Sequence, residues 1–310
     1  MDDRVFKNLT VPFGQYAKPG EPRKKNRLIT GWGHITNMGT KNTIFDENWI
    51  VKARSCDDES SWVKNVMTDI KTTGGLYLSI LKAWFNAFPL QAKQKRKLKS
   101  DIENFKTEEH LGAVNELVLF SFLKREKFQI NPIPVAKGST PDFSVSAPFE
   151  FYLEVTTLNV SQQDKKKIEK NSSIQLNHDE TLRRVLGKLT DEKQKQLAYA
   201  SDNKKPGVLV LFDYTTWSGF STEFYRYLAR FLFGGKCGFL SLPPELSALV
   251  YIERRFFDSR FAISRSRSAA YYNPYAKYPL TMGSFTTINQ FWAQMVHSEP
   301  VTASEAWVYL

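Results

Sequence analysis

Cysteine is scarce in this chain, which holds only Cys56 and Cys237 among its 310 residues. Two thiols so far apart in sequence supply neither a disulfide framework nor the paired spacing of a zinc site. No apolar run reaches the roughly 18 residues that a transmembrane helix needs, so we expect no membrane association. The opening residues also lack the basic-then-apolar layout of a secretory signal peptide, and we expect a cytoplasmic location.

Signature motifs of several enzyme classes are missing as well. The four histidines show no metal-ligand spacing, and neither a Gly-x-Ser-x-Gly nucleophile nor a phosphate-binding glycine loop occurs. Hydrophobic residues make up 42% of the chain and aromatic residues 14%, which is a globular rather than a disordered composition. The chain therefore has ample apolar residues for a buried core, but its sequence contains no motif of a zinc enzyme, a serine hydrolase or a P-loop protein.

Acidic residues are outnumbered, because 32 Asp plus Glu stand against 43 Lys plus Arg and give a net charge of +11. This balance favours polyanionic partners, with nucleic acid first and an acidic membrane surface second. Each basic run taken alone is explained as well by a solvated surface as by a binding site. The basic residues gather in four stretches, which are Arg23–Arg27, Lys93–Lys99, Lys165–Lys170 and Arg254–Arg267.

The pattern of elements divides the chain near residue 105. Residues 1–105 are expected to form a basic N-terminal region that is partly helical and otherwise irregular. Within it we expect a polar helix from Glu47 to Ile70 that Gly74 and Gly75 end. Two further helices are expected over 76–88 and 91–105. Residues 106–310 are expected to form the main domain with a C-terminal extension, and the N-terminal region is a candidate surface for a homodimer or a protein partner.

The main domain is expected to be a mixed α/β sheet flanked by helices. A helix that is apolar on nearly every side runs from Thr107 to about Lys127 and should be buried. The order that follows is three strands, a helix, a strand, a helix and a strand. Their expected ranges are 128–135, 142–147, 149–158, 181–200, 207–213, 223–233 and 248–253.

Three carboxylates occupy places where a carboxylate is costly. Glu116 lies midway along the apolar helix, and Asp142 opens a strand directly after Pro141. Glu154 lies inside a strand whose alternation puts Tyr152, Glu154 and Thr156 on one face. If the strands of Asp142 and Glu154 are antiparallel neighbours, their oxygens converge and suit a hard divalent ion such as Mg²⁺ or Mn²⁺.

These residues resemble the PD-(D/E)xK nuclease superfamily, which has the restriction-endonuclease-like fold. The likeness rests on Pro141-Asp142, on Glu154-Val155-Thr156 with Glu154 twelve positions after Asp142, and on the preceding helix with Glu116, within Thr107–Asp213. It implies an αβββαβ core in which Asp142, Glu154 and the Val155 carbonyl bind Mg²⁺ or Mn²⁺. It also implies that Glu116 completes the metal site.

Thr156 departs from the family pattern, which has a lysine two residues after the glutamate. That lysine offsets charge in the transition state, and some family members supply the cation from the next helix. Lys193 either fills this role or extends past the apolar edge to water. It lies on the inward stripe of the expected helix, whose members are Leu182, Leu186, Leu189, Lys193, Leu197 and Ala200.

The expected function is hydrolysis of phosphodiester bonds by a metal-dependent nuclease, on DNA rather than RNA, in a setting such as restriction, repair or mobile-element defence. The tyrosines within residues 271–278, which follow Arg265 and Arg267 in the sequence, could either stack on bases or pack inside the fold. An inactive nucleic-acid-binding protein and a partner-binding subunit on the same fold are the alternatives. Candidate nucleic-acid contacts are Lys165, Lys166, Lys167, Arg265 and Arg267.

Overall fold

A computed structural model describes residues 43–56, 61–134, 140–159, 166, 177–213, 224–234, 238–292, 296–297 and 306–310. The chain divides into two compact units, Met1–Lys41 and Asn42–Leu310, and all the described residues belong to the second. The boundary expected near residue 105 falls inside that second unit. The physical reason is a shared core, in which residues from Ile44 to Ile102 pack with the central sheet.

Four helices precede the sheet, and their bounds differ from the expected ones. They are α1 (Glu47–Arg54), α2 (Trp62–Thr68), α3 (Thr73–Ala87) and α4 (Ala92–Ile102). The single helix expected over Glu47–Ile70 is wrong, because Ser61 caps a new helix by accepting a hydrogen bond from the Val63 N–H. Gly74 does not end a helix but lies in the first turn of α3, where a Cβ would meet the Val66 carbonyl oxygen at 2.2 Å.

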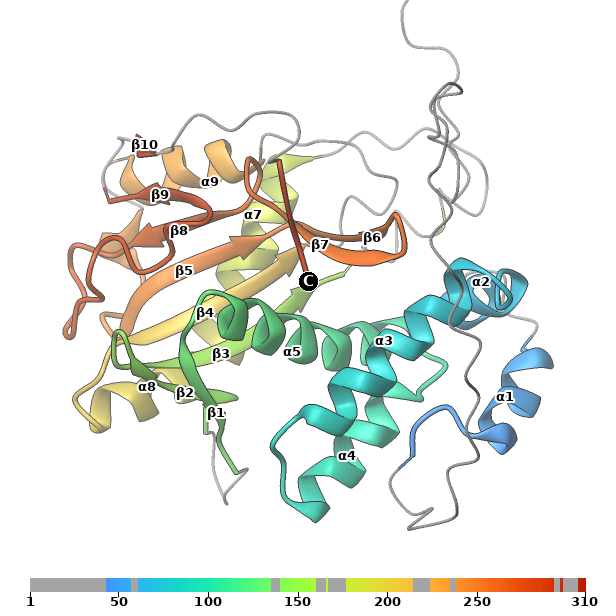
Figure 1. Cartoon of the computed structure of the whole chain (residues 1–310). Coiled ribbons are helices and arrows are strands. Elements are labelled where there is room, and N and C mark those ends of the chain that lie inside the picture. Colours follow the sequence, from blue (N-terminus) through green and yellow to red (C-terminus); the bar gives the residue numbers. More distant parts are fainter. Residues whose placement is uncertain are drawn as a thin grey trace, which may run out of the picture. The chain divides into compact units, whose positions relative to one another are not determined.

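The element order expected for the main domain is confirmed (Figure 1). It begins with α5, continues through three strands, and then alternates helices with strands. The bounds are α5 (Thr107–Arg125), β1 (Gln129–Pro132), β2 (Phe143–Ala147), β3 (Phe151–Leu158), α7 (His178–Gly187), α8 (Gln194–Asp202), β4 (Gly207–Asp213), α9 (Phe224–Phe233) and β5 (Leu246–Ile252).

The described strands form a mixed eight-stranded sheet in the order β1-β2-β3-β4-β5-β8-β9-β10. Strands β1, β2 and β3 are antiparallel, whereas β3, β4 and β5 run parallel to one another. A three-stranded antiparallel sheet that the sequence did not indicate has the order β11-β7-β6. The remaining bounds are β6 (Arg254–Phe257), β7 (Arg260–Ser264), β8 (Ala269–Tyr272), β9 (Asn289–Phe291), β10 (Val296–His297) and β11 (Trp307–Tyr309).

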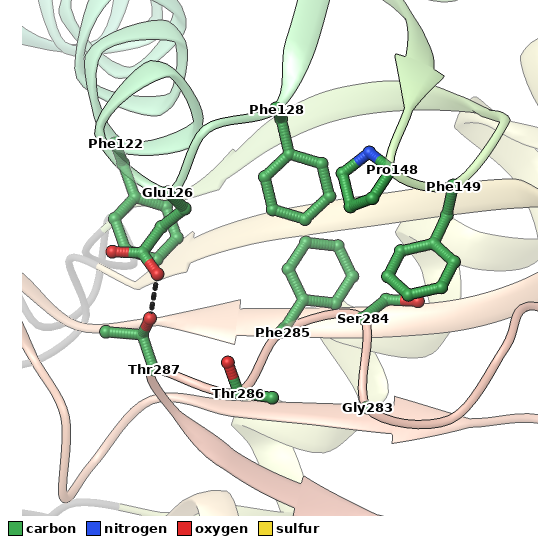
Figure 2. A pocket seen from close by; sticks show the side chains of 10 residues that line it. All are labelled: Phe122, Glu126, Phe128, Pro148, Phe149, Gly283, Ser284, Phe285, Thr286 and Thr287. Carbon is green, nitrogen blue, oxygen red and sulfur yellow. Dashed lines mark hydrogen bonds between the residues drawn. The ribbon is translucent and has the colours of Figure 1, made fainter.

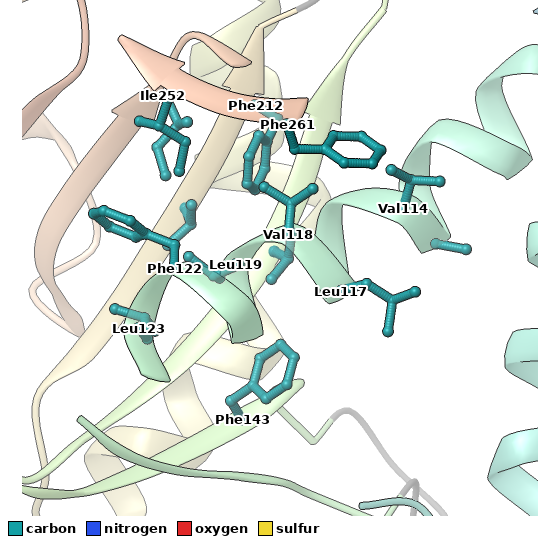
Figure 3. Packing of buried hydrophobic residues seen from close by; sticks show 14 of the residues in the cluster. Val114, Leu117, Val118, Leu119, Phe122, Leu123, Phe143, Phe212, Ile252 and Phe261 are labelled. Carbon is teal, nitrogen blue, oxygen red and sulfur yellow. The ribbon is translucent and has the colours of Figure 1, made fainter. Parts of the chain in front are cut away.

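The central strands separate two hydrophobic cores, because successive side chains of a strand point to opposite faces. In β4, Val208, Val210 and Phe212 belong to the core that contains α5, whereas Leu209 and Leu211 belong to the core beneath α7, α8 and α9. Figure 3 shows the first core, where Val118 and Phe122 of α5 pack among side chains of β2, β4, β5 and β7. Every residue of β4 is buried, as expected of a strand covered on both faces.

Helix α5 is held against β3 by a polar contact as well as by this packing. The Asn115 side-chain amide donates a hydrogen bond of 2.9 Å to Thr157 Oγ1. Because Asn115 precedes Glu116 on α5, this bond fixes the turn that carries the carboxylate.

Among the described residues, no helix is long and apolar enough to cross a membrane.

Candidate active site

Asp142 and Glu154 face each other across the antiparallel strands β2 and β3. Phe143 pairs with Leu153, so Asp142, one residue earlier, lies opposite Glu154, one residue later. The Val155 N–H donates a hydrogen bond of 2.8 Å to Asp142 Oδ2, which holds the aspartate over β3. Glu154 is only 4% exposed, in keeping with its position inside a central strand. The convergence expected from strand alternation is therefore confirmed for these two carboxylates.

Glu116 approaches the same pair from α5. Burial raises its pKa well above the ordinary value, and the charges of Asp142 and Glu154 raise it further. The charge of Asp142 has a larger effect on the pKa of Glu116 than the charge of Glu154 has. Strand pairing thus brings Asp142 and Glu154 together, whereas Glu116 is linked to them only through the effect of their charges on its pKa.

Burial and mutual repulsion favour the protonated forms of the other two acids as well. Burial raises the pKa of Glu154 to about 8, with a further contribution from Asp142, while Lys193 opposes the shift. Burial also raises the pKa of Asp142, although the Val155 N–H and the Lys193 charge lower it in part. A site that crowds carboxylates in this way is suited to a cation that relieves the repulsion.

Lys193 supplies one such cation. Its Nζ lies 2.7 Å from Glu154 Oε1, and its side chain is 20% exposed. The expectation that this lysine points inward is therefore confirmed. Lys195, two residues later, is exposed, also as expected.

The sequence predicts one continuous helix over 181–200, and that prediction is wrong. A π-helical turn over Lys188–Glu192 separates α7 from α8, and the Lys193 N–H bonds to the Lys188 carbonyl at 3.0 Å. Thr190 Oγ1 donates to the Leu186 carbonyl at 3.1 Å, a side-chain bond that competes with regular helical bonding. Lys193 consequently occupies the N-cap of α8 rather than a helix interior. Such π-turns are frequent at functional sites.

Glu154 Oε2 distinguishes the site from an ordinary buried ion pair. It is buried, and no described residue forms a hydrogen bond with it. Gln196 Oε1 on α8 and Thr140 Oγ1 beside Pro141 are buried acceptors in the same situation. An unsatisfied buried carboxylate oxygen is costly, and a bound cation or water would satisfy it.

A divalent ion fits the residues that surround this oxygen. Among the residues that the structure describes, no group of three or more His, Cys, Asp or Glu side chains is arranged to hold a metal by itself. The donor set that the resemblance implies is Asp142, Glu154, the Val155 carbonyl and Glu116, and its three carboxylates do not form such a group in the described residues. Mg²⁺ usually keeps several water ligands, so it needs fewer ligands from the protein. Hard oxygen donors and an unsatisfied carboxylate oxygen match that preference.

Lys97 on α4 is a further cation near the site, and its position was not evident from the sequence. Its charge lowers the pKa of Glu116 and of Asp142, against the larger opposite effect of burial. The run Lys93–Lys99 indicated only a basic helix. Leu98 and Ile102 are buried, and helical periodicity from these two apolar residues could have indicated which lysines of the run face outward.

The structure describes only part of the candidate nucleic-acid contacts. Lys165 and Lys167 lie outside the described residues, and Lys166 is exposed. Arg265 donates to the Thr287 carbonyl at 3.1 Å, and Arg267 pairs with Glu253 at 3.0 Å. Both arginines therefore have structural partners, and their role in binding stays a prediction.

Tyr271 and Tyr272 are packed inside the fold and do not offer their rings to bases. Tyr271 is fully buried and Tyr272 is nearly so. Their hydroxyls donate to the Tyr225 carbonyl and to Gln290 Oε1, respectively. Of the two interpretations of this tyrosine-rich segment, packing is the correct one for these residues.

A small pocket near the C-terminal end of α5 shares no residue with the acidic site (Figure 2). Phe122, Phe128 and Phe285 form its apolar wall, and Glu126 accepts a hydrogen bond from Thr287 at its edge. The aromatic rings pack on one another, so the pocket is an extension of the core rather than part of the acidic cluster.

Comparison with protein-family models, with curated proteins and with solved structures finds no match for this chain. The geometry of Asp142, Glu154, Glu116 and Lys193 is therefore the basis for any functional interpretation.

Proposed function

We propose that this protein is a metal-dependent nuclease of the PD-(D/E)xK type, with the restriction-endonuclease-like fold, acting on DNA rather than RNA. One observation carries the proposal. Asp142 and Glu154 are opposite each other on antiparallel strands, and Lys193 Nζ lies 2.7 Å from a Glu154 oxygen whose twin has no partner among the described residues.

The element order supports the same proposal. An α-helix with an acidic residue, three antiparallel strands, a helical segment with a lysine and a parallel strand follow one another from α5 to β4. This is the αβββαβ order that the resemblance implies. The net charge of +11 is what a partner with a phosphate backbone favours.

Each residue has a distinct task in this proposal. Asp142, Glu154 and the Val155 carbonyl would hold Mg²⁺ or Mn²⁺, with Glu116 completing the ligand set. The bound ion would supply polarisation of the phosphodiester and activation of water. The Val155 N–H fixes the orientation of Asp142, and the Asn115–Thr157 bond fixes the turn of α5 that carries Glu116.

Lys193 replaces the lysine that the family has at the position of Thr156. Cleavage adds negative charge to the phosphate, and an ammonium group in a water-poor site stabilises that charge. Lys193 is 20% exposed and already aligned on Glu154, so it reaches both the carboxylates and the solvent side. Thr156 is buried and uncharged, and it cannot replace this ammonium.

Cleavage assays with plasmid DNA, linear and single-stranded DNA and RNA test the proposal. With Mg²⁺ or Mn²⁺ the wild-type protein is expected to cleave DNA, and EDTA or Asp142→Asn is expected to abolish cleavage. Glu150→Gln, at an exposed carboxylate just before β3, is the matched control and should leave cleavage unchanged. If wild-type protein binds nucleic acid but cleaves no substrate, the binding-only alternative replaces the nuclease.

A further inference from the structure

Helix α4 carries more positive charge than its packing uses. Lys95 donates to the Asn86 carbonyl at 3.2 Å, and Lys99 pairs with Glu103 at 3.3 Å, so both serve the fold. Lys93, Arg96 and Lys97 are exposed, and no hydrogen bond or ion pair joins them to another described residue. Their spacing of three and four residues places all three on one side of the helix.

The opposite side of α4 fixes where this basic face lies. Leu98 and Ile102 are buried in the core that contains α5. On the flank between the buried and exposed sides, Gln94 Nε2 donates to the Ile133 carbonyl at 3.2 Å. The Ile133 N–H in turn donates to the Asp142 carbonyl at 2.9 Å. Two hydrogen bonds therefore connect α4 to the first residue of the acidic site.

Lys97 lies one helical turn after Gln94, on the edge of the basic face that is nearest to Asp142. Its positive charge lowers the pKa of Glu116, of Asp142 and of Asp101, although burial raises each of these pKa values by more. Lys93 and Arg96 continue the exposed face away from that edge. The positive charge on α4 thus begins beside the carboxylates and extends outward along the helix surface.

We propose that Lys93, Arg96 and Lys97 form the surface that binds the nucleic-acid backbone and leads it to the acidic site. The proposal rests on the function proposed above. A phosphate backbone carries one negative charge for about every 1.7 Å of duplex. Such a chain matches a row of exposed cations that ends at carboxylates, because the row attracts the backbone that the carboxylates alone repel.

Binding without cleavage tests this surface. A labelled DNA duplex is titrated with wild-type protein in EDTA over a series of KCl concentrations. For Lys93→Glu/Arg96→Glu/Lys97→Glu we expect affinity to fall by about 10-fold or more, and the slope of log affinity against log salt to fall by about 2–3. The neutral set Lys93→Gln/Arg96→Gln/Lys97→Gln should give the same slope change with a smaller loss.

The matched control is Lys52→Glu/Arg54→Glu/Lys71→Glu, which changes the net charge equally at three other exposed cations. We expect it to keep wild-type affinity within about twofold and most of the salt slope. Equal losses in both sets would overturn the proposal, because they would show attraction by net charge alone. Unchanged binding in both α4 sets would overturn it too, as would binding to vesicles rich in phosphatidylserine without binding to DNA.

Failure of this surface and failure of the nuclease proposal give different results. If wild-type protein cleaves DNA and the α4 variants bind and cleave it equally well, the surface is wrong and the nuclease stands. If wild-type protein never cleaves but loses DNA binding with the α4 charges, the surface stands and the nuclease is wrong. Circular dichroism checks that the variants keep the wild-type helix content.

Discussion

Two regions of this protein bury polar groups, and they satisfy them in different ways. His110 on α5 is fully buried, and its Nδ1–H donates to the Ile102 carbonyl at 2.7 Å while its Nε2 accepts from the Tyr77 hydroxyl at 2.6 Å. Its ring stacks on Trp62 with the ring centroids 3.3 Å apart. Six residues further along the same helix, Glu116 faces two other carboxylates, and an oxygen of Glu154 lacks a partner among the described residues.

The two regions also respond to protons in opposite directions. Burial, together with the smaller effect of the Arg254 charge, lowers the pKa of His110 to about 3, although the hydrogen bond to the Ile102 carbonyl acts in the opposite direction. Burial and neighbouring carboxylates raise the pKa of Glu154 to about 8. Near neutral pH, the interior therefore holds a neutral histidine whose bonds are complete and a carboxyl group that ionises with difficulty.

This difference fits a structural role for the His110 region and the ligand-binding role that we propose for the acidic site. A buried polar group with complete hydrogen bonds stabilises one arrangement of the elements around it. The His110 contacts join α2, α3 and the end of α4 to α5. Carboxylates that crowd together and leave one buried oxygen without a hydrogen bond do not stabilise the fold in this way, and such crowding is typical of sites where a ligand completes the arrangement.

The largest expected effect is on cleavage, and it tests the role assigned to Lys193. Lys193→Ala should reduce the cleavage rate by about 10²-fold or more, because one electrostatic group facing the transition state is lost. DNA affinity should change little, since most phosphate contacts remain. Rates are measured in single-turnover assays with Mg²⁺ on linear DNA.

Lys195→Ala is the matched control for that substitution. Lys195 lies on the same helix and is exposed, so its removal should leave the rate near that of wild type. Equal rates in wild type and both variants would show that this helix does not supply the cation. The site would then resemble the His110 region, with an ion pair that only holds the structure together.

The sequence was sufficient for the features that depend on local pattern. The apolar run Gly207–Asp213 became β4 with the bounds expected. Alternation in β3 placed Glu154 opposite Asp142, and the spacing of leucines placed Lys193 inward. These features follow from the period of a strand or a helix, which a single sequence displays.

Features that depend on contacts between distant segments were not predictable. The π-turn before Lys193 is a local exception, because it interrupts a stretch whose apolar spacing predicts one continuous helix. The position of Lys97 depends on where α4 packs, through Leu98 and Gln94. His110 gave no signal either, because its partners Trp62 and Tyr77 lie on other helices.

The next effect is on stability, in the histidine region. His110→Gln should lower the free energy of unfolding by about 2 kcal/mol at pH 7, since the ring stack and the bond from Tyr77 are lost. The unfolded histidine has a pKa near 6.5 and binds a proton that the folded protein excludes down to about 3. The contribution of His110 to the free energy of unfolding is therefore fully present above pH 6.5, and it is lost as the pH falls toward 3.

Urea unfolding at pH 7 and pH 5 measures this contribution. The gap between wild type and His110→Gln should close by about 2 kcal/mol at pH 5, because only the wild type pays for excluding the proton. His178→Gln, at a partly exposed ring on α7, is the control substitution. A constant gap between wild type and His110→Gln would show that the folded protein accepts the proton.

The smallest effect concerns the acidic site without metal, where the sign is reversed. A carboxyl group with a folded pKa of about 8 and an unfolded pKa near 4.5 binds more protons in the folded state between these values. The free energy of unfolding of the wild type should therefore fall as the pH rises through that window. Glutamine at this position cannot ionise, so the variant avoids the loss, although it also gives up the ion pair with Lys193.

Between pH 5 and pH 8 in EDTA, the free energy of unfolding of Glu154→Gln should therefore rise by about 1 kcal/mol relative to that of the wild type. The full penalty for ionising the buried Glu154 is larger, but side-chain relaxation and water reduce it. Urea unfolding at several pH values measures the difference, and Glu150→Gln, at an exposed carboxylate before the same strand, should follow the wild type. Adding Mn²⁺ should stabilise the wild type and not Glu154→Gln, because the variant loses one of the carboxylates that would hold the ion. If Glu154→Gln instead loses stability steadily as the pH rises, Glu154 and Lys193 form a stabilising pair, and the contrast with the His110 region disappears.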